Sequence, residues 1–219
     1  MKKILFLLII FSQGKAFAQV EISYLSGIGT TNIIPKTNMG VINTNYTEGL
    51  GFTMGCIAEY PIFKGHLYVK SGLFFSEKGA LRSSNPYDSS LLGKRREDVY
   101  YVESPIQLQF KFFPMFKLQA GIYNAMRLNM FPNEYGGYDD SYAHYENRYD
   151  FGYIAGLNFG YKRFVFEVNF LKSIKRVGVE SRWDSEQNKI VLSDDIRYYN
   201  QNLFFTLGYK LFTDQNTEN

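Results

Sequence analysis

Residues 100–112 read YYVESPIQLQFKF, and apolar and polar side chains alternate along almost the whole stretch. The even-numbered positions are aromatic or aliphatic apart from one serine, whereas the odd-numbered positions include a glutamate, two glutamines and a lysine. Side chains in a β-strand point alternately to opposite faces, so this stretch predicts a strand with one uncharged face and one charged face. Such a strand suits a transmembrane barrel, whose outer face meets lipid and whose inner face meets a polar lumen.

The same alternation recurs in seven other stretches, and in each of them the charged residues stay on one face. On the faces that we expect to point outward, only Ser26, Ser71, Ser104 and Asn124 are polar, and none of the residues is charged. The eight predicted strands are Val20–Ile28, Leu50–Tyr60, Leu67–Phe75, Tyr100–Phe112, Leu118–Met130, Phe151–Phe159, Phe164–Phe170 and Leu203–Leu211.

The connections between these strands alternate between long and short. Short periplasmic turns and long extracellular loops are typical of up-and-down outer-membrane barrels, and an even strand number returns both ends to the periplasmic side. The sequence therefore predicts an all-β fold, an eight-stranded antiparallel up-and-down transmembrane β-barrel. Within the last long connection, residues 177–192 are expected to extend as a hairpin around residues 185–188. In the last strand, Phe212 is out of phase with the outward-facing Tyr209 and Leu211.

The N-terminal residues have the pattern of a secretory signal peptide. Lys2 and Lys3 precede an apolar run, Ile4–Phe11, and the small-residue pattern Ala16-Phe17-Ala18 follows it. Eight apolar residues are too few to span a bilayer, which needs about 20. We therefore expect a signal peptide over residues 1–18, a barrel domain over residues 19–219 with a short periplasmic tail at residues 213–219, and export to the outer membrane.

Net charge and cysteine content narrow the class of protein further. Lys2, Lys3 and Lys15 account for the whole formal charge of +3, so the chain after the expected cleavage site is close to neutral. A neutral chain gives no electrostatic reason to expect nucleic-acid binding. The single cysteine, Cys56, cannot form an internal disulfide and lies on the apolar face of its predicted strand, where it acts as a small hydrophobic residue.

The inward faces of the predicted strands carry both acids and bases. An eight-stranded barrel is only wide enough for its own side chains to fill, and unpaired buried charges are costly, so we expect ion pairs across the lumen. A conductive or proton-relay path through the same groups is the alternative interpretation. The expected lumen charge network is Glu21, Glu59, Lys70, Glu103, Lys111, Arg127, Asp150, Glu167 and Lys210.

Candidates for catalysis or metal binding are few. His66 lies at a predicted turn, and His144 lies near Ser141 and Glu146 in a predicted loop, without the spacing of a known nucleophile and base pair. The acidic residues of the same loop lack the EF-hand pattern. We therefore expect no catalytic residue, no metal site and no cofactor.

The long loops are the better candidates for recognition. Tyrosines alternate with acidic residues between Asn133 and Asp150, and tyrosine offers a rigid amphipathic contact to a protein or glycan. Packing of these tyrosines on one another is the alternative. The basic run Lys94-Arg95-Arg96 in another long loop could meet lipopolysaccharide phosphates through charge-assisted hydrogen bonds, and a solvated run of surface charges is the alternative. The candidate recognition residues are Tyr135, Tyr138, Tyr142, Tyr145 and Tyr149.

Several short motifs occur in a characteristic order along the chain. They are Ser71–Phe75 with Lys78-Gly79, Val102–Ile106 leading into Phe110–Phe112, Leu118–Gly121, Asp150–Gly152 with Gly156, and Leu207–Lys210. In these residues the chain resembles the PorT-like outer-membrane β-barrel family of Bacteroidetes. The resemblance implies an eight-stranded outer-membrane barrel with no catalytic motif, and its named member is associated with protein secretion and gliding motility machinery.

Four functions remain open at the level of the sequence. We favour a non-enzymatic outer-membrane barrel with a structural or interaction role in secretion or motility, in contact with outer-membrane lipid and lipopolysaccharide. The others are an outer-membrane enzyme that modifies lipid, a soluble secreted barrel of lipocalin type with its charges outward, and a substrate-conducting pore. The sequence does not indicate the oligomeric state.

Overall fold

The computed structural model describes residues 20–37, 40–41, 46–63, 66–82, 95–128, 141–144, 147–184 and 189–212. The predicted signal peptide and the predicted tail lie outside the described residues. The described part of the chain contains no helix long and apolar enough to cross a membrane.

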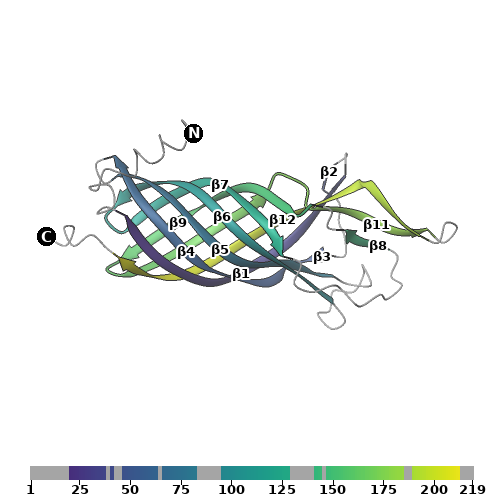
Figure 1. The fold of residues 1–219 in the computed structure, drawn as a ribbon, viewed down its shortest axis with the longest axis horizontal. Coiled ribbons are helices and arrows are strands. Elements are labelled where there is room, and N and C mark those ends of the chain that lie inside the picture. The colour runs from purple at the N-terminus through teal and green to yellow at the C-terminus, as the bar shows by residue number, and fades with distance from the viewer. Residues whose placement is uncertain are drawn as a thin grey trace, which may run out of the picture.

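Eight long strands form a closed antiparallel barrel, as the alternating pattern predicts. Each strand pairs with the next one in the chain, and the last strand returns to pair with the first, from Ile22 opposite Phe212 to Lys36 opposite Arg197. Figure 1 shows the strands tilted with respect to the long axis of the barrel. The barrel strands are β1 (Glu21–Thr37), β4 (Gly49–Phe63), β5 (Leu67–Arg82), β6 (Arg95–Phe113), β7 (Phe116–Leu128), β9 (Tyr149–Tyr161), β10 (Phe164–Ser173) and β12 (Lys189–Phe212).

Four shorter strands lie at the end with the long connections. β2 (Gly40–Val41) pairs with β1, and β3 (Tyr46–Thr47) pairs with β5. β11 (Gly178–Asp184) pairs with the upper part of β12, and β8 (Ser141–His144) pairs with β11. These strands project beyond the barrel at the end opposite the short turns (Figure 1).

The predicted hairpin around residues 185–188 is confirmed, but the bounds of the eighth strand were wrong. β12 runs from Lys189 to Phe212 without interruption, so the strand expected to begin at Leu203 is also the second arm of the hairpin. The alternation of outward apolar residues ends near Leu203 because the strand leaves the lipid there. Above that level the sequence no longer alternates between apolar and polar residues, although the backbone pairing of the strand continues.

The predicted outward face is confirmed at every position that the structure describes, since none of these side chains is buried. Exposed apolar residues such as Leu73, Ile106 and Leu207 keep 55–60% of their surface accessible. This finding contradicts the lipocalin alternative, which requires the charged face to point outward. An apolar face of this extent on a closed barrel is satisfied by lipid.

Aromatic side chains concentrate near both edges of the apolar band. Near the short turns, the rings of Phe112 and Phe116 have centroids 6.1 Å apart, and Phe116 lies 5.0 Å from Phe159. Near the opposite edge, Phe75 lies 5.8 Å from Tyr100. Two aromatic belts of this kind mark the two interfaces of a membrane.

The end of β12 departs from simple alternation. A register shift between Ile22 and Ser23 of β1 lets two residues of β12 occupy the place of one. As a result Leu211 and Phe212 are 50% and 66% exposed, so Phe212 faces outward although it is out of phase in the sequence. The last aromatic residue of the barrel therefore joins the lower aromatic belt.

The outward face gives a direct test of the membrane placement. Ile122 on β7 is 47% exposed and pairs with the outward-facing Ile106. The variant Ile122→Arg is expected to destabilise the barrel by about 2–4 kcal/mol in lipid vesicles, because a guanidinium near the bilayer midplane loses its hydration. Tyr161→Arg, at the short-turn edge, is the control and should cost only about 0–1 kcal/mol. Equal urea midpoints for the two variants would contradict the placement.

Candidate functional site

The lumen is the part of the structure where charged and polar side chains converge, and they do so at three levels. The lowest level lies beside the short turns. Lys210 and Glu21 form an ion pair of 2.9 Å, and Lys117 pairs with Glu59, which also accepts a hydrogen bond of 3.1 Å from Gln109. The Lys117 ammonium lies 4.2 Å from the centre of the Tyr68 ring. The periplasmic mouth of the lumen is therefore occupied by paired charges.

The middle level is an ion pair between Lys70 and Glu167. The Lys70 ammonium donates to both carboxylate oxygens of Glu167, at 2.5 and 2.6 Å, and both residues are almost wholly buried. Asn158 and Asn169 donate to the same carboxylate at 2.8 and 3.0 Å. Gln119 links this level to the lower one, since it accepts from Gln109 at 2.8 Å and donates to Asn169 at 2.6 Å. Glu167 is thus a charged acceptor with four donated hydrogen bonds.

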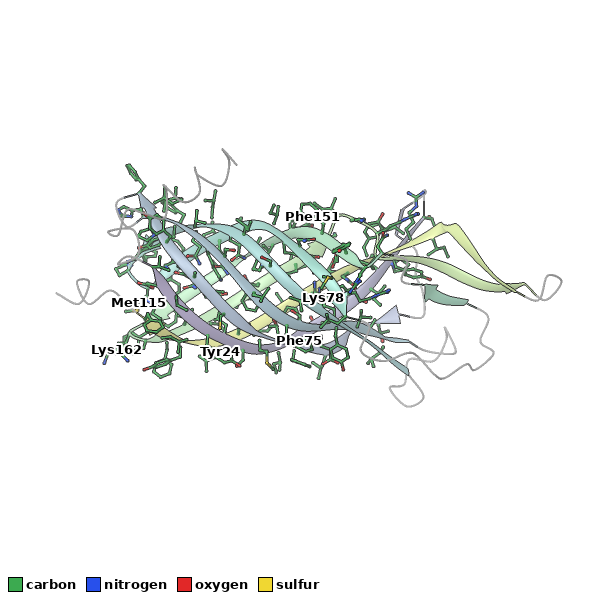
Figure 2. All side chains as sticks on the ribbon, viewed as in Figure 1. Tyr24, Phe75, Lys78, Met115, Phe151 and Lys162 are labelled. Atoms are coloured by element: carbon green, nitrogen blue, oxygen red, sulfur yellow. The ribbon has the colours of Figure 1, made fainter. Side chains whose placement is uncertain are left out.

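The upper level is organised by Lys78, which is fully buried. Its ammonium lies 2.5 Å from Glu103 and 3.5 Å from Asp150, and 4.5 Å from the centre of the Tyr123 ring. Figure 2 places Lys78 near the end of the barrel that also carries Phe75 and Phe151, whereas Met115 and Lys162 mark the opposite end. Lys70 and Lys78 are eight residues apart on one strand, about 26 Å along it.

Asp150 receives further hydrogen bonds from three strands. Ser173 donates to it at 2.6 Å, Asn200 at 3.0 Å and Tyr123 at 3.2 Å. Because the carboxylate is completely buried, these bonds replace the water that it would bind in solution. The upper level therefore ties β5, β6, β7, β9, β10 and β12 together through one connected network.

A small cavity separates the middle and upper levels. Its volume is about 30 Å³, which is room for about two water molecules. Gln107 and Thr206 line it, and their buried side-chain polar atoms have no hydrogen-bond partner among the described residues. Phe74, Ile154, Leu171 and Phe204 supply its apolar wall. A cavity of this size has room for isolated water molecules and not for a larger solute.

Above the charged levels an apolar cluster covers the lumen. Ile33, Ala80, Val177 and Tyr198 are buried against one another, with Ile196 packed beside them. Val177 donates its backbone N–H to Tyr198 at 2.9 Å and accepts one from Asn147 at 3.4 Å, so residues between β10 and β11 are held over the barrel. Paired charges below and this cluster above fill the described lumen.

The predicted lumen residues all lie inside the barrel, but two of the bases that pair with them were missed. The structure brings together the pairs Glu21 with Lys210 and Lys70 with Glu167. Glu59 pairs instead with Lys117, and Glu103 and Asp150 share Lys78. Lys111 is half-buried and lines a second cavity, of about 70 Å³, at the lowest level beside Glu59 and Lys117. Arg127 is half-buried opposite Tyr101.

The parity of residue numbers along each strand would have identified both missing bases as inward-facing. Lys78 has the same parity as the inward-facing Lys70, and Lys117 has the same parity as Gln119. Lys78 was assigned to a connection because the apolar alternation on the opposite face stops at Phe75, and Lys117 because the predicted strand began one residue later, at Leu118. The strands are longer than their lipid-facing segments, and the lumen continues as far as the strands do.

The structure places only part of the predicted loop site. Tyr149 is the first residue of β9 and is 51% exposed, so it belongs to a barrel strand and not to a loop. Tyr142 and His144 lie in β8, where their backbone pairs with β11. His66 lies at a short turn, and its Nδ1 is 3.5 Å from the carbonyl of Lys111. Tyr135, Tyr138, Tyr145, Lys94, Glu146 and the acidic residues Glu134, Asp139 and Asp140 lie outside the described residues.

The backbones of Arg95 and Arg96 begin β6, which extends the barrel above the lipid. The assignment of the basic run to a loop was therefore wrong for Arg95 and Arg96. Their Cα partners on β5 are Arg82 and Leu81.

The chain is similar to several solved structures and matches one family model. Ail, the attachment invasion locus protein of Yersinia pestis, solved in complex with the heparin analogue sucrose octasulfate, is 17% identical over 87% of this chain and 99% of its own, with a TM-score of 0.39. Neisserial surface protein A is 12% identical over 86% of this chain and 97% of its own, with a TM-score of 0.45. No curated protein matches the sequence. The family model of the outer membrane protein beta-barrel domain matches residues 11–177, and the chain therefore belongs to that family of outer-membrane proteins.

Proposed function

We propose that the protein is a non-enzymatic interaction component of the outer membrane, of the PorT-like kind, in which the barrel anchors an extracellular extension. The observation that carries this proposal is the contrast between the two parts. The lumen is filled by paired charges, whereas β11 and the upper part of β12 continue beyond the apolar band as a hairpin. An anchored, projecting sheet is suited to contact and not to transport.

The filled lumen argues against conduction. A solute or a row of ions would have to displace Lys70 from Glu167 and Lys78 from Glu103, and both pairs are buried. Removing one partner from a buried ion pair costs about 3–5 kcal/mol. Displacing these buried partners would therefore be costly, and we place the surface available for function at the extracellular end.

The partners follow from that location and from the family resemblance. Secretion or motility proteins would meet the extension formed by β8, β11 and β12, together with the tyrosine-containing connection before Tyr149. Outer-membrane lipid and lipopolysaccharide would meet the outer face of the barrel. Export through the signal peptide at residues 1–18 and a short periplasmic tail at residues 213–219 complete the proposal.

Shortening the hairpin tests the interaction role. Glu180 and Ser193 are Cα partners, so a two-residue Asn-Gly turn can join them after removal of Ser181–Leu192. The full-length protein, tagged at its C-terminus and extracted in mild detergent, should recover secretion or motility proteins that the shortened variant loses. The control replaces only residues 185–188 with Asn-Gly, between the paired Asp184 and Lys189. Recovery of the full-length barrel alone, or the same partners with the shortened variant, would contradict the proposal.

A further inference from the structure

Four basic residues lie on β1, on β12, at the end of β10 and just after β10, where the apolar band of the outer face ends. Lys36 is opposite Arg197 across the β1–β12 seam, and Lys172 is opposite Gln201 on the next strand pair. Lys175 follows β10 and is exposed. We name this set, Lys36, Lys172, Lys175 and Arg197, the outer basic patch.

The orientation of the outer basic patch follows from its neighbours. Ile196 and Tyr198 pack into the apolar cluster above the lumen. Side chains alternate along a strand, so the alternate residues, Arg197 and Tyr199, face outward. The Lys36 ammonium lies 4.9 Å from the centre of the Tyr199 ring, on that same face. Lys172 shares its face with Phe164 and Phe166, whose side chains are exposed to lipid.

The height of the patch matches the headgroup region of the outer leaflet. Tyr153 is the Cα partner of Lys172, and its ring lies 6.4 Å from that of Phe170, the preceding outward-facing residue of β10, in the upper aromatic belt. On β12, the lipid-facing Phe205 and Leu203 are followed by Gln201, so the apolar face ends where the patch begins. Aromatic belts lie at the interface, and charged groups just beyond them lie among headgroups.

The charge of the patch is not neutralised within the protein. The lumen bases Lys70, Lys78 and Lys117 each contact a carboxylate. Among the residues whose side chains the structure describes, no carboxylate lies within ion-pair distance of the outer basic patch, and the buried Nε of Arg197 has no hydrogen-bond acceptor. The backbones of Asp194 and Asp195 lie between Ser193 and Arg197, within the register shift between β11 and β12.

From this arrangement we infer that the outer basic patch binds the phosphate groups of lipopolysaccharide in the outer leaflet. Arginine and lysine bind phosphate through charge-assisted hydrogen bonds, and the planar guanidinium of Arg197 can contact two phosphate oxygens at once. Tyr199 and Gln201 add neutral hydrogen-bonding groups between the cations. The inference assigns a site to the lipid contact in the proposed function and rests on that contact.

The test compares lipopolysaccharide binding by two sets of variants in nanodiscs of neutral phospholipid. The patch variant carries Lys36→Gln, Lys172→Gln, Lys175→Gln and Arg197→Gln. It should bind purified lipopolysaccharide at least about tenfold more weakly than the wild type, and dephosphorylated lipopolysaccharide should bind both equally weakly. The control variant carries Lys162→Gln and Arg163→Gln at a short periplasmic turn and should bind like the wild type.

The outcomes separate this site from the proposed function. Equal binding of lipopolysaccharide by the wild type and the patch variant would overturn the site and leave the lipid contact standing. No binding by the wild type would overturn both the site and the lipid contact, whereas loss of protein partners in the co-purification experiment would not bear on the patch. Equal losses in the patch and control variants would also overturn it, because charge alone would then explain binding.

Discussion

Replacing Glu167 with leucine is expected to destabilise the barrel by about 3–5 kcal/mol, because the buried Lys70 ammonium then has no carboxylate partner. The hydrogen-bond donors of Asn158 and Asn169 lose the same acceptor. The expected result is a much lower urea midpoint in lipid vesicles, followed by far-UV circular dichroism. In gel electrophoresis, the folded form of the variant should convert to the unfolded, shifted form at a lower temperature than the wild type does.

A second substitution distinguishes a lost ion pair from general damage to packing. The double variant Lys70→Met with Glu167→Leu removes both charges, so it should recover most of the stability that Glu167→Leu loses. Recovery is expected to be incomplete because Asn158 and Asn169 stay without their acceptor. A double variant no more stable than Glu167→Leu would show that the pair does not govern stability.

The variant Gly121→Val is expected to prevent folding of most of the protein. A Cβ at this position would lie 2.0 Å from the carbonyl oxygen of Ile106 and 2.7 Å from the Cα of Gln107. Both contacts are with the backbone of β6, which cannot move without breaking its pairing with β7. Overpacking of this kind costs typically about 1–3 kcal/mol and more where the backbone is involved. The measurement is the yield of heat-shiftable barrel after refolding.

Gly160 supplies the matched control for that variant. A Cβ there has no heavy atom within 4 Å, and the residue lies at the end of β9 beside a short turn. Gly160→Ala should therefore refold with the yield and urea midpoint of the wild type. A wild-type yield from Gly121→Val would contradict the close approach of β6 and β7 at that point.

Alternation predicted the barrel well because the membrane enforces it. Each residue that faces lipid, such as Leu73 or Leu207, must be uncharged, and each neighbour in the strand then faces the lumen. The same rule explains the errors in the strand bounds. Above the lipid the outer face no longer has to be apolar, as Lys36 and Arg197 show, so the alternation disappears while the strands continue. The shift that turns Phe212 outward is a property of pairing with β1 and leaves no local signal.

The sequence predicted most of the charged residues that face the lumen, but not which of them form ion pairs. Parity places Glu103 and Asp150 inside, yet it does not say that both face Lys78, since that depends on the tilt and stagger of strands far apart in sequence. The same limit applies to Glu59 and Lys117. A sequence gives the face of each residue, whereas the height at which two inward residues meet is set by the closed geometry of the whole barrel.

The seam between β1 and β12 has a consequence for biogenesis. It joins the first barrel strand to the last one over nearly the full length of β1, so the ring cannot close before β12 has been synthesised and delivered. Until then β1 and β10 each present a row of unpaired backbone groups, which hydrocarbon cannot satisfy. Insertion is therefore all-or-none, and a chain that stops before Leu203 has no intermediate in which it can reside stably in the bilayer.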